Sequence, residues 1–128
     1  MASNTEQRKR YAASIRGRAV KMWHNAKRRS NKSEAKVTID VNWIEARLKL
    51  GVCELTGLQF DLSSTSKFSS NPYAPSLDKI DSKIKDYTPE NTRIVLAAVN
   101  TALNEYGEVV LFPILKSLLK AIEIRSCL

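Results

Sequence analysis

Apolar residues recur at helical spacing through the first thirty residues. Their steps of three or four residues place them on one face of a helix, which we expect over residues 5–30. A single glycine, Gly17, weakens this helix without breaking it. The apolar stripe consists of Tyr11, Ile15, Ala19, Met22 and Ala26.

The middle of the chain changes from extended to helical spacing and then loses its apolar pattern. A short extended piece is expected at residues 37–39, followed by a helix over residues 41–50. Asp40 is placed to cap this helix, and Gly51 to end it. Residues 63–75 are rich in Ser, Asn and Pro, which predicts a surface loop.

The second half of the chain predicts two strands followed by two helices. Short apolar runs favour strands at residues 76–81 and 92–95, separated by a turn region. A helix is expected over residues 96–106, ended by Gly107, and residues 109–128 have a helical apolar pattern. We therefore expect an α+β fold that is mostly helical.

The charge of the chain is concentrated at its front. The 128 residues carry a formal net charge of +8. Residues 1–50 hold 13 basic and 4 acidic side chains, a net charge of +9, and residues 51–128 hold 8 and 9, a net charge of −1. No acidic residue lies between Gln7 and Ser33, so like charges repel along the predicted helix. A charged run is often only a solvated helix face, but contacts with a nucleic-acid backbone would offset this repulsion. The predicted DNA-binding residues are Arg8, Lys9, Arg10, Arg16, Arg18, Lys21, Lys27, Arg28 and Arg29.

The composition argues against a membrane-spanning, secreted or disulfide-rich protein. No stretch approaches the ~20 apolar residues of a membrane span, and we find no secretory leader, so we expect a soluble, cytoplasmic protein. Cys53 and Cys127 are too few for a disulfide framework, and Cys53 is interpreted as a buried small residue. We interpret Trp23 and Trp43 as core residues rather than as platforms for base stacking.

Several short motifs lie between residues 52 and 106. They are C-E-L-T-G at residues 53–57, P-S-L-D-K-I-D at residues 75–81, Y-T-P-E-N-T-R-I-V at residues 87–95, and Asn100. In this stretch the sequence resembles the HNH (His-Me finger, ββα-metal) endonucleases, and in particular small phage-type members. The resemblance implies a ββα-metal core, and a bacterial host cell if the protein is encoded by a phage.

The resemblance also implies a role for individual residues. Asp78 matches the acidic metal ligand of the first strand, and Asn100 matches the second ligand, on the following helix. Asn91 matches the central Asn that orients the base and its loop. The implied cofactor is Mg²⁺ or Mn²⁺, because a hard cation needs only one or two protein oxygens and keeps its remaining waters. Relatives with paired Cys-x-x-Cys knuckles bind zinc, but the chain has no second pair, so no structural zinc is expected.

The position of the general base departs from the family pattern, because Lys79 stands where the family has His. A lysine is a poor base at neutral pH unless a metal and other cations nearby lower its pKa. Lys79 could instead bind a phosphate and leave proton abstraction to Asp81 or to metal-bound water, and Asp81 could be a simple turn residue. Arg93 could hold a phosphate oxygen or pair with Glu90. His24, the single histidine, is interpreted as a surface residue.

The sequence thus predicts a basic helical arm at residues 1–36 and an HNH-like domain at residues 37–128. The expected function is divalent-metal-dependent hydrolysis of DNA phosphodiester bonds. The alternative is a catalytically inactive DNA-binding protein with the same fold. An RNA- or ribosome-binding module would explain the basic arm, but not Asp78, Asn91 and Asn100. The apolar C-terminal helix could close the core or form a homodimer interface.

Overall fold

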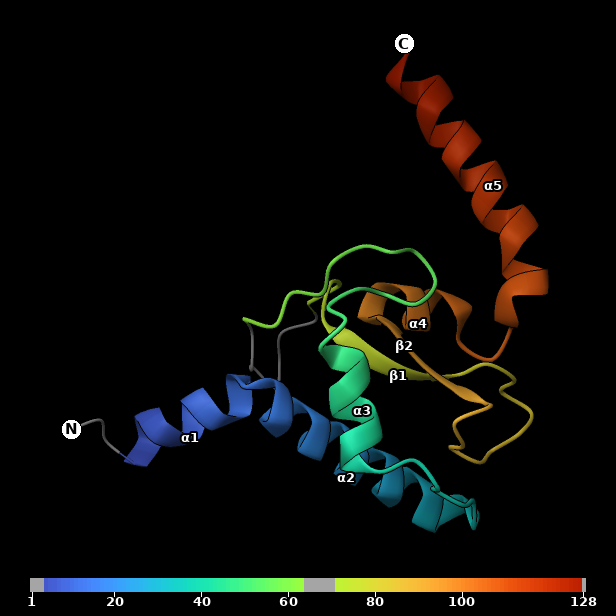
Figure 1. Ribbon diagram of the computed structural model, residues 1–128. Coiled ribbons are helices and arrows are strands. Elements are labelled where there is room, and N and C mark those ends of the chain that lie inside the picture. Colours follow the sequence, from blue (N-terminus) through green and yellow to red (C-terminus); the bar gives the residue numbers. More distant parts are fainter. Residues whose placement is uncertain (1–3, 64–70, 128) are drawn as a thin grey trace.

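The computed structural model describes residues 4–63 and 71–127, with the backbone alone for Lys9, Ala12 and Ala13. These residues form five helices and a two-stranded antiparallel sheet, which confirms the α+β fold class (Figure 1). The predicted loop at residues 63–75 falls largely outside the described residues. The elements are α1 (Asn4–Ala13), α2 (Ile15–Ser33), α3 (Val41–Leu48), β1 (Pro75–Lys79), β2 (Thr92–Leu96), α4 (Ala97–Leu103) and α5 (Gly107–Ser126).

The helix expected over residues 5–30 is in fact two helices that meet at Ser14. The Ser14 backbone is extended, and its side chain accepts a hydrogen bond from the Gly17 amide at 3.0 Å, as an N-cap residue does. Its hydroxyl donates to the Tyr11 carbonyl at 2.6 Å. A Cβ atom on Gly17 would lie only 1.9 Å from that carbonyl oxygen, so glycine is required at this corner.

Helix α2 packs into the core of the molecule. Its small residues Ala19 and Ala26 are buried, which allows close contact with α3 and the sheet. The core cluster therefore crosses the domain boundary predicted at residue 36. Trp23 and Trp43 pack against this cluster, as expected for core residues. The buried members of the cluster are Ala19, Ala26, Ile39, Ile44, Leu48, Leu77, Tyr87 and Ile94.

The two strands run antiparallel, and α4 follows β2 without a loop. Leu77 pairs with Ile94 in the register, and Asp78 pairs with Arg93. The apolar pair contributes to the core, and the charged pair is also largely buried, with its side chains 11% and 6% exposed. The order of these elements is strand, strand, helix.

The C-E-L-T-G segment lies along the free edge of β2. The Sγ atom of Cys53 accepts a hydrogen bond from the Leu96 amide at 3.3 Å, and the Glu54 carboxylate accepts one from the Ile94 amide. Cys53 is buried, as expected from the sequence. These side chains satisfy backbone groups that an edge strand would otherwise leave unpaired. The motif therefore has a structural role in this fold.

Helix α5 projects away from the rest of the molecule (Figure 1). Leu111, near its beginning, is buried, whereas most of its other apolar side chains are exposed. Pro113 lies in its second turn. Gly107, at a φ of 77°, begins this helix, whereas the sequence analysis expected it to end the preceding one; α4 has already ended at Leu103. No helix in the described part of the chain is long and apolar enough to cross a membrane.

Candidate functional site

A pocket of about 320 Å³ opens beside the end of β1, and we call it the polar pocket. It brings together Asp78, Lys79 and Asn100, three residues to which the resemblance assigns the metal and base positions. Arg29, from the basic helix α2, also lines this pocket. The lining residues are Arg29, Leu77, Asp78, Lys79, Ser82, Tyr87, Asn100, Asn104 and Glu105.

Asp78 is held by an ion pair with Arg93. The Arg93 Nε atom lies 2.7 Å from Asp78 Oδ2, and the two side chains are only 11% and 6% exposed. The Arg93 Nη1 atom also lies 3.3 Å from Glu108 Oε2. Burial lowers the pKa of Arg93, but the hydrogen bonds and charges of Asp78 and Glu108 outweigh it and raise the pKa above its usual value. The carboxylates that pair with Arg93 are thus Asp78 and Glu108, whereas the sequence had suggested Glu90 or a phosphate oxygen.

Asn100 lies on α4, and its side-chain amide is fixed against β1. Its Nδ2 atom donates to Ser76 Oγ at 2.7 Å and to the Leu77 carbonyl at 3.1 Å. Both donor positions of the amide nitrogen are thereby used. The amide oxygen is left as the atom of Asn100 that can bind a ligand.

Lys79, at the end of β1, has its ammonium group above an aromatic ring. The Nζ atom lies 5.3 Å from the centroid of the Tyr87 ring. The negative face of an aromatic ring attracts a positive charge at this distance. Lys79 is therefore placed in the pocket as a cation held by Tyr87.

Asn91 is buried, and it connects the start of β2 to the loop between the two strands. Its Oδ1 atom accepts a hydrogen bond from the Asp81 amide at 2.8 Å. Its Nδ2 atom donates to the carbonyls of Asp81, Ile84 and Asp86 at 3.1–3.3 Å. One side chain thus fixes the backbone of the loop that follows Lys79, although Asn91 itself does not line the pocket.

Asp81 is exposed and does not line the polar pocket. Its Oδ1 atom accepts a hydrogen bond from the Lys83 amide at 3.0 Å, two residues further along the chain. This is the geometry of an Asx turn, in which a short side chain replaces a backbone acceptor. Of the two roles considered for Asp81, the structure favours the turn residue over the general base.

Arg16 and Arg18, two of the predicted DNA-binding residues, make contacts with other segments of the protein. Arg18 is half-buried and donates to the Leu62 carbonyl at 2.8 Å. Burial lowers the pKa of Arg18, and the charge of Asp61 offsets part of this change. Arg16 forms a 2.7 Å ion pair with Glu45 on α3. These two residues fasten α2 to the rest of the fold.

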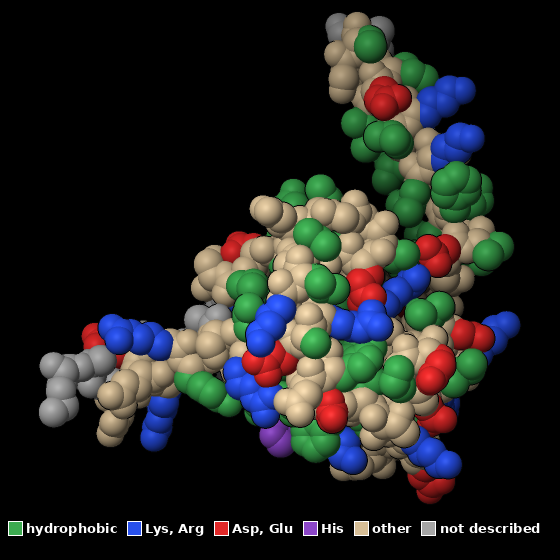
Figure 2. Space-filling view, in the orientation of Figure 1, with side chains coloured by type: hydrophobic (Ala, Val, Ile, Leu, Met, Phe, Trp, Pro, Cys, Tyr) green, Lys and Arg blue, Asp and Glu red, His purple; other side chains and the backbone are tan. Residues whose placement is uncertain are grey.

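The other basic residues of the first two helices lie at the surface, apart from Lys9, whose side chain is outside the described residues. Lys27 is half-buried, with its Nζ atom 5.5 Å from the Trp23 ring centroid. His24 is exposed, as expected, and does not line the polar pocket. The remaining predicted DNA-binding residues that are exposed are Arg8, Arg10, Lys21, Arg28 and Arg29. Figure 2 shows Lys and Arg side chains along the N-terminal helix and across the adjoining face of the body.

Four polar residues of the pocket were missed by the sequence analysis: Ser82, Tyr87, Asn104 and Glu105. Tyr87 lies within a recognised motif, but its place beneath Lys79 depends on tertiary packing. Glu105 belongs to no motif and follows the end of α4, where the Ser82 hydroxyl donates to its carbonyl at 3.1 Å. No sequence signal pointed to Glu105.

The donor set of the polar pocket suits a hard cation. Asp78 and Asn100 offer a carboxylate and an amide oxygen, and Mg²⁺ commonly binds few protein oxygens and several waters. In the described ranges, no three His, Cys, Asp or Glu side chains cluster in a way that could hold a metal ion. Comparison with family models, curated proteins and solved structures finds no match for this chain. What the protein does is therefore inferred from the pocket and its surroundings.

Proposed function

We propose that the protein is a divalent-metal-dependent DNA endonuclease of the HNH type, with the polar pocket as its active site. One observation carries this proposal. Asp78 and Asn100, which are 22 positions apart and lie on a strand and a helix, line one pocket together with Lys79. In this proposal β1, β2 and α4 form the ββα-metal core that the resemblance implies.

Asp78 and Asn100 would hold Mg²⁺ or Mn²⁺ through their oxygen atoms. Arg93 keeps the Asp78 carboxylate in one orientation through Oδ2, and Ser76 fixes the Asn100 amide. Partners of this kind orient metal ligands and commonly change metal affinity by ~10–100-fold when they are removed. The bound ion would stabilise negative charge on the phosphate and on the leaving oxygen.

Lys79 and Arg29 serve in this proposal as phosphate-binding cations. Both line the polar pocket, and Lys79 is held over the Tyr87 ring as a positive charge. A fixed cation attracts a phosphate but cannot take a proton from water. Lys79 therefore positions the substrate in this account, although it occupies the position of the family's base.

Glu105 is the residue that we assign as general base. Asp78 and Glu105 are the two carboxylates that line the polar pocket, and Asp78 is engaged by Arg93. Glu105 is exposed, so water can reach its carboxylate. A carboxylate within hydrogen-bond distance of a water molecule can accept its proton during attack on a phosphate.

The basic surface of the first two helices would bind the DNA backbone. Arg29 connects this surface to the polar pocket, and Arg8, Arg10, Lys21 and Arg28 are exposed along the same helices. Each phosphate that the protein neutralises on duplex DNA contributes a slope of about −0.9 to the salt dependence of log K. Replacing one of these residues should reduce that slope by roughly one unit.

Incubation with supercoiled plasmid and Mg²⁺ or Mn²⁺ tests the proposed activity. The wild-type protein should nick the plasmid, and the variants Asp78→Ala and Asn100→Ala should not. Asn31→Ala, on an exposed position of α2 outside the pocket, is the matched control and should remain active. Equal residual cleavage in all four proteins would contradict the proposal.

A catalytically inactive DNA-binding protein is the second candidate, and two observations favour it. The ligand candidate Asp78 is already neutralised by Arg93, and the base position holds a cation. On this reading, the wild-type protein binds duplex DNA with a steep salt dependence but leaves it uncut. Nicking that appears only in a Lys79→His variant would support this reading.

A further inference from the structure

Helix α5 carries a wide apolar face that the rest of the molecule leaves exposed. Six side chains on this face are each between 43% and 67% exposed. Figure 2 shows hydrophobic side chains clustered along the projecting helix. The six residues are Phe112, Ile114, Leu115, Leu118, Leu119 and Ile122. A face of this kind on a projecting helix marks a contact surface rather than a solvated helix.

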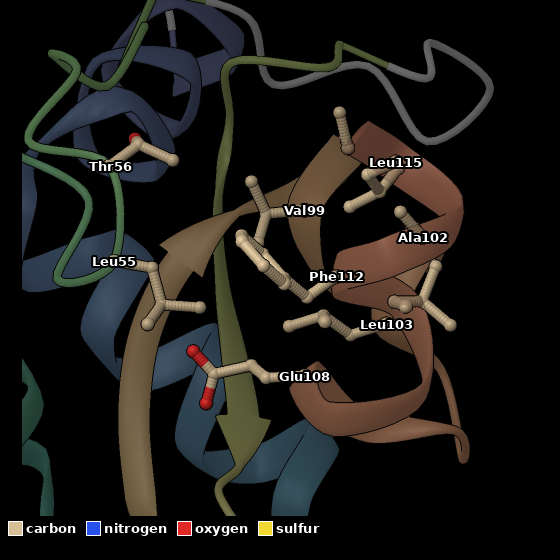
Figure 3. Close-up of a pocket in the computed structure, with 10 residues that line it drawn as sticks. Leu55, Thr56, Val99, Ala102, Leu103, Glu108, Phe112 and Leu115 are labelled. Carbon is tan, nitrogen blue, oxygen red and sulfur yellow. The ribbon is translucent and has the colours of Figure 1, made fainter. Parts of the chain in front are cut away.

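This face continues into an apolar groove between α4 and α5. The groove has a volume of about 390 Å³, and its walls include Leu55, Val99, Leu103 and Phe112. Figure 3 shows the Phe112 side chain beside Val99 and Leu103, with Leu55 across the groove. Leu115 belongs both to the groove and to the exposed face of α5. A partner that covers the helix would therefore also reach the groove.

We propose that this surface pairs with the same surface of a second copy of the chain, with the two α5 helices antiparallel. Its area suits such a pairing. The six side chains, each 43–67% exposed, together with the apolar groove would supply much of the roughly 800 Å² that each partner buries in an interface of standard size. A two-fold arrangement also brings like surfaces together without leaving a second apolar face free.

The charges beside the apolar face are self-complementary in one antiparallel register. Lys116 and Glu123 are seven residues apart, so they lie on the same side of α5. A two-fold axis between Leu118 and Leu119 places Leu115 opposite the second copy's Ile122. Each Lys116 is then within about 3 Å, along the helix axis, of the level of Glu123 in the other copy. Two symmetric ion pairs would flank the apolar contact.

Sedimentation across a micromolar concentration series tests the pairing. The wild-type protein should be a dimer, and Leu118→Glu should weaken the dimer at least about tenfold, because it buries a charge in the contact. Ser117→Glu is the matched control, since Ser117 is exposed and lies outside the apolar face. Circular dichroism should show all three proteins equally helical. A wild-type protein that is monomeric throughout would overturn the proposal. It would be overturned equally if the monomer bound phosphatidylserine vesicles, because the apolar face would then contact lipid and not a second copy.

Cysteine cross-linking tests the antiparallel direction, in a chain whose exposed Cys127 is replaced by serine. Leu119→Cys should form a disulfide dimer, because residue 119 lies near the two-fold axis. Phe112→Cys should not, because antiparallel helices place the two residues 112 roughly 20 Å apart along the axis. Equal cross-linking of both variants would mean parallel helices and would overturn this arrangement. Neither result depends on whether the polar pocket cleaves DNA.

Discussion

Helix α4 separates two pockets of similar size and opposite character. Asn100 and Asn104 line the polar pocket on one side, while Val99 and Leu103 line the apolar groove on the other. The walls of the polar pocket are fixed by hydrogen bonds and an ion pair, whereas the groove opens onto the exposed face of α5. The polar pocket is arranged before any ligand arrives, whereas the apolar groove would leave water only if a partner covered it.

Removal of the Arg93 guanidinium should have the largest effect on stability. An Arg93→Met variant leaves the Asp78 carboxylate, 6% exposed, without its partner. Breaking a buried ion pair in this way should lower the free energy of unfolding by about 3 kcal/mol, measured by urea denaturation. Lys21→Met, at an exposed position, is the control and should change it by less than about 0.5 kcal/mol. A loss below about 1 kcal/mol for Arg93→Met would show that the ion pair does not hold this wall of the pocket.

Removal of the Asn91 side chain should have the next largest effect. An Asn91→Ala variant leaves the Asp81 amide and the carbonyls of Ile84 and Asp86 without this partner. We expect a loss of about 2 kcal/mol, because backbone groups in a partly buried loop lose their hydrogen bonds. Hydrogen exchange should show faster exchange of the Asp81 amide, while the helical amides of α2 stay protected. Unchanged exchange at Asp81 would contradict the role of Asn91 in fixing the loop.

A carboxylate outside both pockets should give the smallest effect, visible only in acid. Hydrogen bonds from Ser63 and Asn71 lower the pKa of Asp61 from 3.8 to about 2. The stabilisation is therefore fully present above pH ~4 and is lost as the pH falls toward ~2. Melting temperatures of the wild type and Asp61→Asn should differ above that range and converge below it. A constant difference at every pH would show that the charge of Asp61 is not involved.

The secondary structure could largely be predicted from local patterns. Asp40 caps α3 as expected, through a 2.7 Å hydrogen bond from the Trp43 amide. The break at Ser14 was missed because apolar spacing continues through it from Tyr11 to Ile15. The local signal for the break was Ser14, three residues before Gly17. At Gly17 the chain leaves no room for a Cβ atom.

The candidate site was only partly predictable. The resemblance to the HNH endonucleases implied that Asp78, Lys79 and Asn100 would lie together, and the structure places them in one pocket. The pairing of Arg93 with Glu108 depends on where α5 begins, which is a tertiary feature that no local pattern contains. Arg18 resembles its basic neighbours in sequence, and its contact with the Leu62 carbonyl appears only after folding.

The proposed metal site can be tested most directly by replacing Mg²⁺ with Fe²⁺ in the presence of ascorbate. Hydroxyl radicals formed at the bound ion cut the nearby backbone, and mass spectrometry locates the cuts. Our account predicts cuts near Asp78 and Asn100, which excess Mg²⁺ suppresses and Asp78→Ala abolishes. Cuts only elsewhere in the chain, or no cuts that Mg²⁺ suppresses, would contradict a metal-dependent nuclease site in the polar pocket.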